Sequence, residues 1–253
     1  MASSAARPRS ASFAERVAHR EKTVVLASVG VLSMLAWLYL AAGAGMAMTM
    51  VMAPPPLPLV VAMWWVMMTA MMLPSATPAI LLYARVRIHR GRQVAPTGVF
   101  MLGYLLAWLG FSLAAAAVQS ALAGTPQWDA MAERLSRPLT AGAALIAAGV
   151  YQLSPWKGAC LSQCRSPAAF ITRHWRPGAV GALRLGLLHG AVCVGCCWLL
   201  MLLLFVGGVM NLAWVAALAA LVAVEKVAPR GMLISRAVGA MMIAAGFALI
   251  VLP

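Results

Sequence analysis

The stretch from Leu183 to Val209 reads LRLGLLHGAVCVGCCWLLMLLLFVGGV, and its only charged residue is Arg184. A run of about 20 apolar residues is long enough to cross a bilayer as a helix, so this stretch predicts a transmembrane helix. Four chemically active residues lie inside it within nine positions: His189, Cys193, Cys196 and Cys197. Successive residues of an α-helix advance by about 100°, which places these four side chains on one face.

Imidazole and thiolate groups on a common helix face are soft donors that suit Cu(I) or zinc. Two ordinary interpretations compete with a metal site. Cysteine is often buried as a small hydrophobic residue, and an intramembrane histidine can simply hydrogen-bond a neighbouring helix. Ionisable groups inside a bilayer are costly and usually functional, however, so we predict metal ligands at these four positions.

The composition of the whole chain favours a membrane protein. Of the 253 residues, 64% are hydrophobic and 9% are charged, and the net charge is +14. The basic residues lie mostly between apolar runs, where they orient a membrane protein and do not indicate nucleic-acid binding. We therefore expect an all-α, polytopic membrane helix bundle over residues 23–253, preceded by a basic cytoplasmic tail at residues 1–22. About seven transmembrane helices are expected, at Thr23–Ala42, Leu59–Tyr83, Thr97–Val118, Pro138–Leu153, the stretch that carries the cysteines, a sixth run ending at Val224, and Met232–Leu252.

Charge distribution predicts the orientation of these spans. With the N-terminus inside, all but two of the 19 Lys and Arg lie on the cytoplasmic side, and the exceptions are Arg134 and Arg137. This agrees with the positive-inside rule, so we expect an N-in, C-out protein of the bacterial inner membrane. Five cysteines divided between a span and a basic loop do not form a disulfide framework.

Three further sulfur groups are candidate metal ligands. In an extended segment alternate residues project to one side, so four alternating methionines present a row of thioethers there, although methionine is also common apolar filler. The second span carries methionines at helical spacing, and its two prolines, Pro74 and Pro78, predict a kinked helix that lines protein interior or a cavity. A cysteine pair at i, i+4 lies in the basic loop Ser154–Gly178. The residues concerned are Met46, Met48, Met50 and Met52 in the first group, Met63, Met67, Met71 and Met72 in the second, and Cys160 and Cys164 in the third.

Depth along the spans brings two of these groups to a similar level. At 1.5 Å per residue, Met71 and Met72 lie about as deep from one side as Cys196 and Cys197 lie from the other. Both pairs then fall in the middle of a hydrocarbon core about 30 Å thick. We expect two- or three-coordinate sites on the cysteine face, completed by Met67, Met71 or Met72 if the two helices pack together.

Five blocks of the sequence stand out: WWVMMTAMMLP from Trp64, YQLSP from Tyr151, CLSQCRSP from Cys160, HGAVCVGCCW from His189 and GVMN from Gly208. In combination they resemble the signature blocks of a known bacterial family, the predicted metal-binding integral membrane proteins. The resemblance covers the chain from about residue 30 to the end and implies copper handling, because some members are described as copper chaperones serving a tyrosinase-type polyphenol oxidase.

The sequence is therefore interpreted as an inner-membrane protein that binds Cu(I) and passes it to an exported copper enzyme, or across the membrane. Its partners would be the bilayer and a periplasmic or membrane copper protein. No GxxxxGK[ST] loop is present, and Glu225 is the only acidic residue near a predicted span end, so no enzymatic activity is expected. Zinc stays open as the metal. A membrane thiol oxidoreductase, or a partner-binding subunit without metal, stays open as the function.

Overall fold

The computed structural model describes residues 9–43, 55–90 and 95–252. This part of the chain is helical apart from connecting loops and one short hairpin, so the prediction of an all-α fold is confirmed. The helices are α1 (Arg9–Ala41), α2 (Leu57–Arg90), α3 (Thr97–Leu122), α4 (Pro138–Leu153), α5 (Pro155–Arg165), α6 (Pro167–His174), α7 (Gly178–Leu202), α8 (Leu204–Gly207), α9 (Leu212–Val227) and α10 (Gly231–Val251). The antiparallel strands β1 (Trp128–Asp129) and β2 (Arg134–Leu135) form the hairpin.

Five helical segments of the described chain are long and apolar enough to cross a membrane. They are Glu21–Ala41, Leu57–Arg87, Thr97–Leu122, Gly178–Gly207 and Gly231–Val251. Helices α4 and α9 are also apolar but have 16 residues each, fewer than the about 20 that a full crossing needs. A membrane bundle is thus supported by five helices, and a seven-span arrangement stays a prediction.

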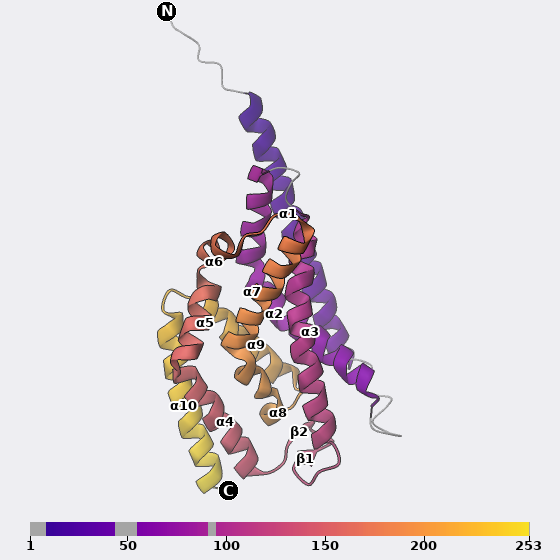
Figure 1. Ribbon diagram of the computed structural model, residues 1–253. Helices are drawn as coiled ribbons and strands as arrows, with labels where there is room; N and C mark the ends of the chain where they lie inside the picture. The colour runs from indigo at the N-terminus through magenta and orange to yellow at the C-terminus, as the bar shows by residue number, and fades with distance from the viewer. Residues whose placement is uncertain (1–8, 44–54, 91–94, 253) are drawn as a thin grey trace, which may run out of the picture.

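The long helices run side by side along one axis of the molecule (Figure 1). Helix α3 packs along α7, α4 packs along α10, and α1 packs along α2. The hairpin and the last residues of α10 lie at one end, which we call the hairpin end. Helix α6 lies toward the opposite end, which we call the α6 end. Successive long helices therefore alternate in direction between the two ends.

Helices α3 and α7 approach so closely that their backbones touch. A Cβ atom built on Gly186 of α7 would clash with the carbonyl oxygen of Phe100, and one built on Gly103 of α3 would clash with that of Leu183. Small residues allow this kind of contact between membrane helices, where dispersion forces replace the hydrophobic effect as the source of affinity. The close approach brings α3 against the face of α7 that carries the cysteines.

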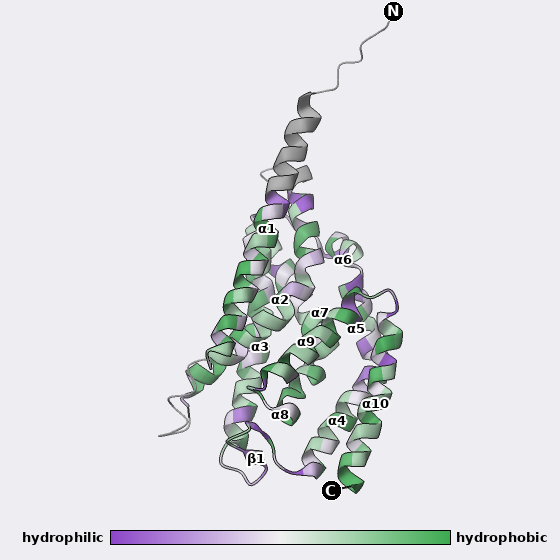
Figure 2. Ribbon diagram, turned by 180° about the vertical axis from the view of Figure 1, so that it is seen from behind, coloured by the Kyte–Doolittle hydropathy of each residue, from purple (hydrophilic) through white to green (hydrophobic). Residues whose placement is uncertain are grey.

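Apolar side chains cover the outside of the bundle as well as its core. Figure 2 shows hydrophobic residues along most of the helices and hydrophilic residues near the hairpin and at the α6 end. Large apolar residues such as Leu35, Leu38, Val150 and Phe247 are exposed on the surface. A helix that is hydrophobic all round fits a lipid environment, and this pattern agrees with a membrane protein.

One sequence expectation differs from the structure. The basic segment Ser154–Gly178, which its charges predict to be a loop, contains α5 and α6. At least one of these charges does not face solvent, because Lys157 of α5 is buried inside the fold. The tail at residues 1–22 is helical from Arg9 onward and continues into the first apolar run.

The prolines of α2 do not end that helix. Pro74 and Pro78 both lie inside α2, which continues to Arg90. Residues around them line an internal cavity that also borders Cys193, as expected for helix positions that lack backbone donors.

Candidate metal centre

The face of α7 that carries the histidine and the cysteines points into the bundle. His189, Cys193, Cys196 and Cys197 are all buried there. The common face expected from helical spacing is therefore present. Because α7 is one unbroken helix, side chains at i, i+3 and i+4 converge without any bend in the backbone.

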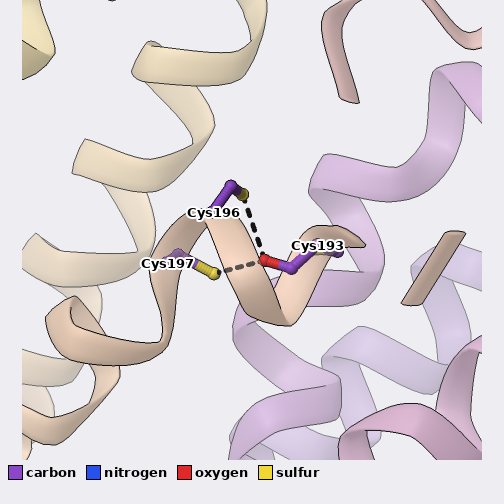
Figure 3. Close-up of side chains that lie close together, drawn as sticks. All are labelled: Cys193, Cys196 and Cys197. Carbon is purple, nitrogen blue, oxygen red and sulfur yellow. Dashed lines mark hydrogen bonds between the residues drawn. The ribbon is translucent and has the colours of Figure 1, made fainter. Parts of the chain in front are cut away.

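Three cysteine sulfurs form a compact cluster. The Sγ atoms of Cys193, Cys196 and Cys197 all lie within 4.8 Å of one another. A metal–sulfur bond of about 2.3 Å places two sulfurs on opposite sides of an ion about 4.6 Å apart, so this spacing suits a shared metal ion. The thiols of Cys196 and Cys197 both donate to the backbone carbonyl of Cys193, each at 3.0 Å (Figure 3). Small side-chain rotations would release both sulfurs for coordination.

Two neighbouring helices add further sulfur atoms to this cluster. Cys164 of α5 donates its thiol to the Sγ of Cys196 at 3.9 Å, and the Sδ of Met72 of α2 lies 4.0 Å from the Sγ of Cys197. The set therefore comprises four cysteine sulfurs and one thioether from three helices. Cys160, the other half of the predicted pair, lies against α7 at Gly195, where an added Cβ would be 3.2 Å from its sulfur.

A lysine also reaches the sulfur cluster. The Nζ of Lys226, in the last turn of α9, donates to the Sγ of Cys193 at 2.9 Å and to the Oγ of Ser75 at 3.0 Å, and it lies 3.9 Å from the Sδ of Met72. An ammonium group in this position balances the negative charge of a thiolate. In the sequence Lys226 marks only the end of a span, because basic residues commonly flank apolar runs.

A tyrosine hydroxyl completes the polar surroundings of Cys193. Tyr104 of α3 donates its O–H to the backbone carbonyl of Met72 at 3.1 Å, and its oxygen lies 3.1 Å from the Sγ of Cys193. Since a hydroxyl has one proton and two lone pairs, this oxygen can accept a hydrogen bond from the thiol S–H of Cys193. Tyr104 is not among the residues predicted from the sequence, because one tyrosine in an apolar span carries no spacing signal.

His189 lies beside the cluster and not within it. Its ring packs among those of Phe100, Tyr104 and Phe170, at centroid distances of 6.1, 6.0 and 5.2 Å. It also lines a cavity of about 260 Å³ together with Cys164, Cys193 and Lys226. The cavity continues past Arg165 and Pro167, where α5 meets α6, so it leads from the sulfur cluster toward the α6 end.

A buried ion pair holds the last turn of α9 in place. Lys157 of α5 donates to a carboxylate oxygen of Glu225 at 2.6 Å, and the side chain of Gln152 donates to the other oxygen at 2.7 Å. The guanidinium of Arg165 donates to the backbone carbonyl of Glu225 at 2.8 Å. These contacts join α5 to α9, so they fix Cys164 and Lys226 in their positions beside the α7 cysteines.

The predicted methionine ligands divide into three groups. Met72 lies beside Cys197, in agreement with the depth comparison. Met67 and Met71 of α2 are buried in the core of the bundle, and within the described ranges neither accepts a hydrogen bond from a thiol. The third group, Met46, Met48, Met50 and Met52, lies outside the described residues.

Comparison with known proteins identifies one family. The model of the PpoB2 copper chaperone family matches residues 61–249, about three quarters of the chain, and this range contains every residue of the sulfur cluster. No curated protein and no solved structure matches the chain.

Proposed function

The chain belongs to the PpoB2 copper chaperone family, and from this premise we propose that it is a membrane protein that binds Cu(I) at Cys193, Cys196 and Cys197 and passes it to a partner copper protein. The observation that carries the proposal is the cluster of three sulfurs within 4.8 Å of one another on one face of α7. Thiolate and thioether donors select soft ions, and Cu(I) is a softer ion than zinc.

The charges around the cluster also favour a monovalent ion. Cu(I) bound by two thiolates carries one net negative charge, which the ammonium of Lys226 would balance. Zinc prefers four ligands in a tetrahedron and commonly includes imidazole, whereas His189 lies outside the cluster. The carboxylate of Glu225 is not available as a ligand, because it is already paired with Lys157.

Loading of the cluster from the α6 end would proceed by exchange between neighbouring soft ligands. Cys164 lies 3.9 Å from Cys196 and borders the cavity that reaches the α6 end. An ion could therefore move between the α7 cysteines and Cys164 without leaving sulfur coordination. His189, which lines the same cavity, would be the next donor along this route.

We further propose that the molecule spans the bacterial inner membrane seven times, with the α6 end in the cytoplasm and the hairpin end outside. Basic residues of the α5–α7 connection, including Arg165, Arg173 and Arg176, support this orientation. The recipient would then be an exported copper enzyme. A reporter fused after Asp129 should lie outside the membrane, and one fused after Arg176 should lie inside it. The reverse result would invert the proposed orientation.

Metal analysis of the purified full-length protein tests the copper site. After anaerobic loading and competition with a Cu(I) chelator, the parent protein should retain copper with sulfur-dominated X-ray absorption. The variant with Cys193, Cys196 and Cys197 all changed to Ser should lose it. Cys160→Ser is the matched control, because Cys160 is a half-buried thiol on α5 outside the cluster. Full copper retention and an unchanged spectrum in the triple variant would refute the site.

A further inference from the structure

A further buried acidic side chain lies at the hairpin end, away from the sulfur cluster. The side chain of Glu133, in the turn of the hairpin, is 3% exposed. Neither of its carboxylate oxygens receives a hydrogen bond from any described residue. Burial raises the pKa of this carboxyl to about 7. A buried carboxylate without a partner is costly, so the inward position of Glu133 lowers the stability of the fold.

The backbone that turns Glu133 inward is held by a second turn. Glu133 has a φ of 46°, in a region that non-glycine residues seldom adopt. Its carbonyl accepts a hydrogen bond from the backbone N–H of Val209 at 3.1 Å. Gly208, with a φ of 101°, makes the tight turn that brings Val209 there. Residues held in such conformations by their surroundings often belong to functional sites.

Glu133 lines a cavity of about 430 Å³. The first residues of α2, the last turn of α3 and the hairpin form its walls, contributing Val60, Gln119 and Trp128 among others. The carbonyl oxygen of the Gln119 side chain is already engaged by the indole N–H of Trp64, at 2.6 Å. A cavity of this size accommodates an organic group, and one carboxylate among mainly apolar walls suits an alkyl chain that ends in a positive charge.

The described residues around the cavity offer no cation to this carboxylate. Residues 44–54, which precede the cavity-lining Pro55, contain no Lys, Arg or His. A metal ion would need several converging donors, and among the described residues the cysteine cluster is the one group of three or more His, Cys, Asp or Glu with suitable spacing. A counter-charge for Glu133 would therefore have to come from an organic cation outside the chain.

A lipid headgroup fits the cavity less well than a protein side chain. The ammonium of a phospholipid is accompanied by a phosphate, and none of the described residues that line the cavity is a Lys, Arg or His able to receive that negative charge. A lysine or arginine side chain brings a cation on a flexible apolar stem, which can pack on apolar walls and on the indole of Trp128. Met131 at the cavity is 95% exposed and offers additional apolar contact to an approaching protein.

We propose that this pocket anchors a lysine or arginine side chain of the protein that docks at the hairpin end, with Glu133 as its counter-ion. The inference rests on the proposed function only in taking that protein to be the copper recipient. The pocket shares no residue with the sulfur cluster, so binding of a cationic side chain can be measured without copper.

The test uses the metal-free, full-length protein in detergent. N-acetyl-lysine methylamide is the probe, and N-acetyl-norleucine methylamide is the uncharged control with the same alkyl stem. We expect saturable binding of the lysine probe by saturation-transfer NMR, with at least a tenfold loss of affinity in Glu133→Gln. Asp129→Asn is the matched variant and should bind normally, because Asp129 acts as an acceptor for the backbone N–H groups of Met131 and Ala132, which asparagine can also do.

Four results would overturn the proposal: equal binding of the norleucine compound, unchanged affinity in Glu133→Gln, displacement of the lysine probe by phosphatidylethanolamine at equal concentration, or loss of copper binding when Glu133→Gln is loaded with Cu(I) in a separate experiment. The variant with Cys193, Cys196 and Cys197 changed to Ser should bind the lysine probe normally. Failure of the copper site and failure of the docking pocket are therefore distinguished.

Discussion

Two glutamates of this protein are almost equally buried, yet their surroundings are opposite. Glu225, at the junction of α5 and α9, is 1% exposed and receives both the ammonium of Lys157 and the amide of Gln152. Glu133, in the hairpin, is 3% exposed and receives no donor within the described ranges. Desolvation is costly for both, but only the first carboxylate recovers that cost inside the fold. A buried charge whose partners are complete supports the structure, whereas one whose partners are missing is available to a ligand.

The last turn of α9 shows the same difference between adjacent residues. Glu225 meets a full counter-charge, while Lys226 meets sulfur atoms and the hydroxyl of Ser75. Consecutive helix residues point about 100° apart, so one residue faces α5 and the next faces the α7 cysteines. The ion pair fixes the helix, and the fixed helix then holds the ammonium of Lys226 beside Cys193.

Breaking the ion pair between Lys157 and Glu225 should have the largest effect on stability. Glu225→Leu leaves the ammonium of Lys157 buried without a counter-charge, which should lower the free energy of unfolding by about 3–5 kcal/mol. Thermal unfolding of the detergent-purified protein measures this. The double variant Lys157→Met with Glu225→Leu should recover most of the loss, because it removes both charges. If the single variant is as stable as the parent, the pair does not anchor α9.

Removing the central sulfur should affect copper binding and leave the fold unchanged. Cys196 adjoins Cys193 and Cys197 and is also 3.9 Å from Cys164, so Cys196→Ser leaves Cys193 and Cys197 as the one remaining pair of the three clustered sulfurs. We expect Cu(I) affinity to fall about 100-fold, which corresponds to about 2.7 kcal/mol. Chelator competition measures the affinity. A fall of equal size in Cys160→Ser would show that the effect is not specific to the cluster.

The sulfur cluster also shows how far the sequence alone could go. The common face of His189 and the cysteines follows from helical spacing, and the approach of Met72 to Cys197 agrees with their matched depths. Both are consequences of regular helix geometry. The approach of Cys164 and Lys226 depends on which helices are neighbours, and local periodicity does not encode that.

Polarity is a misleading guide to the segment Ser154–Gly178. Its charges indicate a solvated loop, but Lys157 forms a buried ion pair with Glu225, 68 positions away. Glu133 likewise looks like one more charge of a polar loop, because nothing in its sequence neighbourhood shows that a turn at Gly208 will hold it inward. Long-range pairing decides both cases.

Removing the ammonium of Lys226 should have a moderate effect on copper affinity. Lys226→Gln eliminates the charge that would balance Cu(I) bound by two thiolates, so Cu(I) affinity should fall about tenfold, or about 1.4 kcal/mol. Lys226→Arg keeps the positive charge and should retain affinity within about threefold if its longer head is accommodated beside Ser75. Chelator competition again gives the values. Tighter copper binding in Lys226→Gln would mean that the ammonium competes with the metal and does not assist it.

Removing the charge of Glu133, which has no partner among the described residues, should have the smallest effect on stability. This change should stabilise the protein, whereas Glu225→Leu should destabilise it. The carboxyl of Glu133 has a pKa of about 7 in the folded protein, raised from 4.5 by burial. The folded state therefore holds a proton that the unfolded state has released between these pH values. Stability should fall as pH rises from 4.5 to 7 and change little above 7.

Glu133→Gln keeps the shape of the side chain and removes this titration. The charged groups on the same hairpin are Asp129 and Arg134, and both are retained in the variant. One pKa unit corresponds to about 1.4 kcal/mol, and the buried amide of the glutamine offsets part of the gain because it also lacks a partner, so we expect the variant to be about 1 kcal/mol more stable than the parent at pH 8. At pH 4.5 the two proteins should be nearly equal. Unfolding curves at both pH values measure this, and a less stable variant at pH 8 would show that Glu133 has a partner within the fold. A more stable variant that no longer binds the lysine probe would show that the protein gives up stability here to keep a binding site.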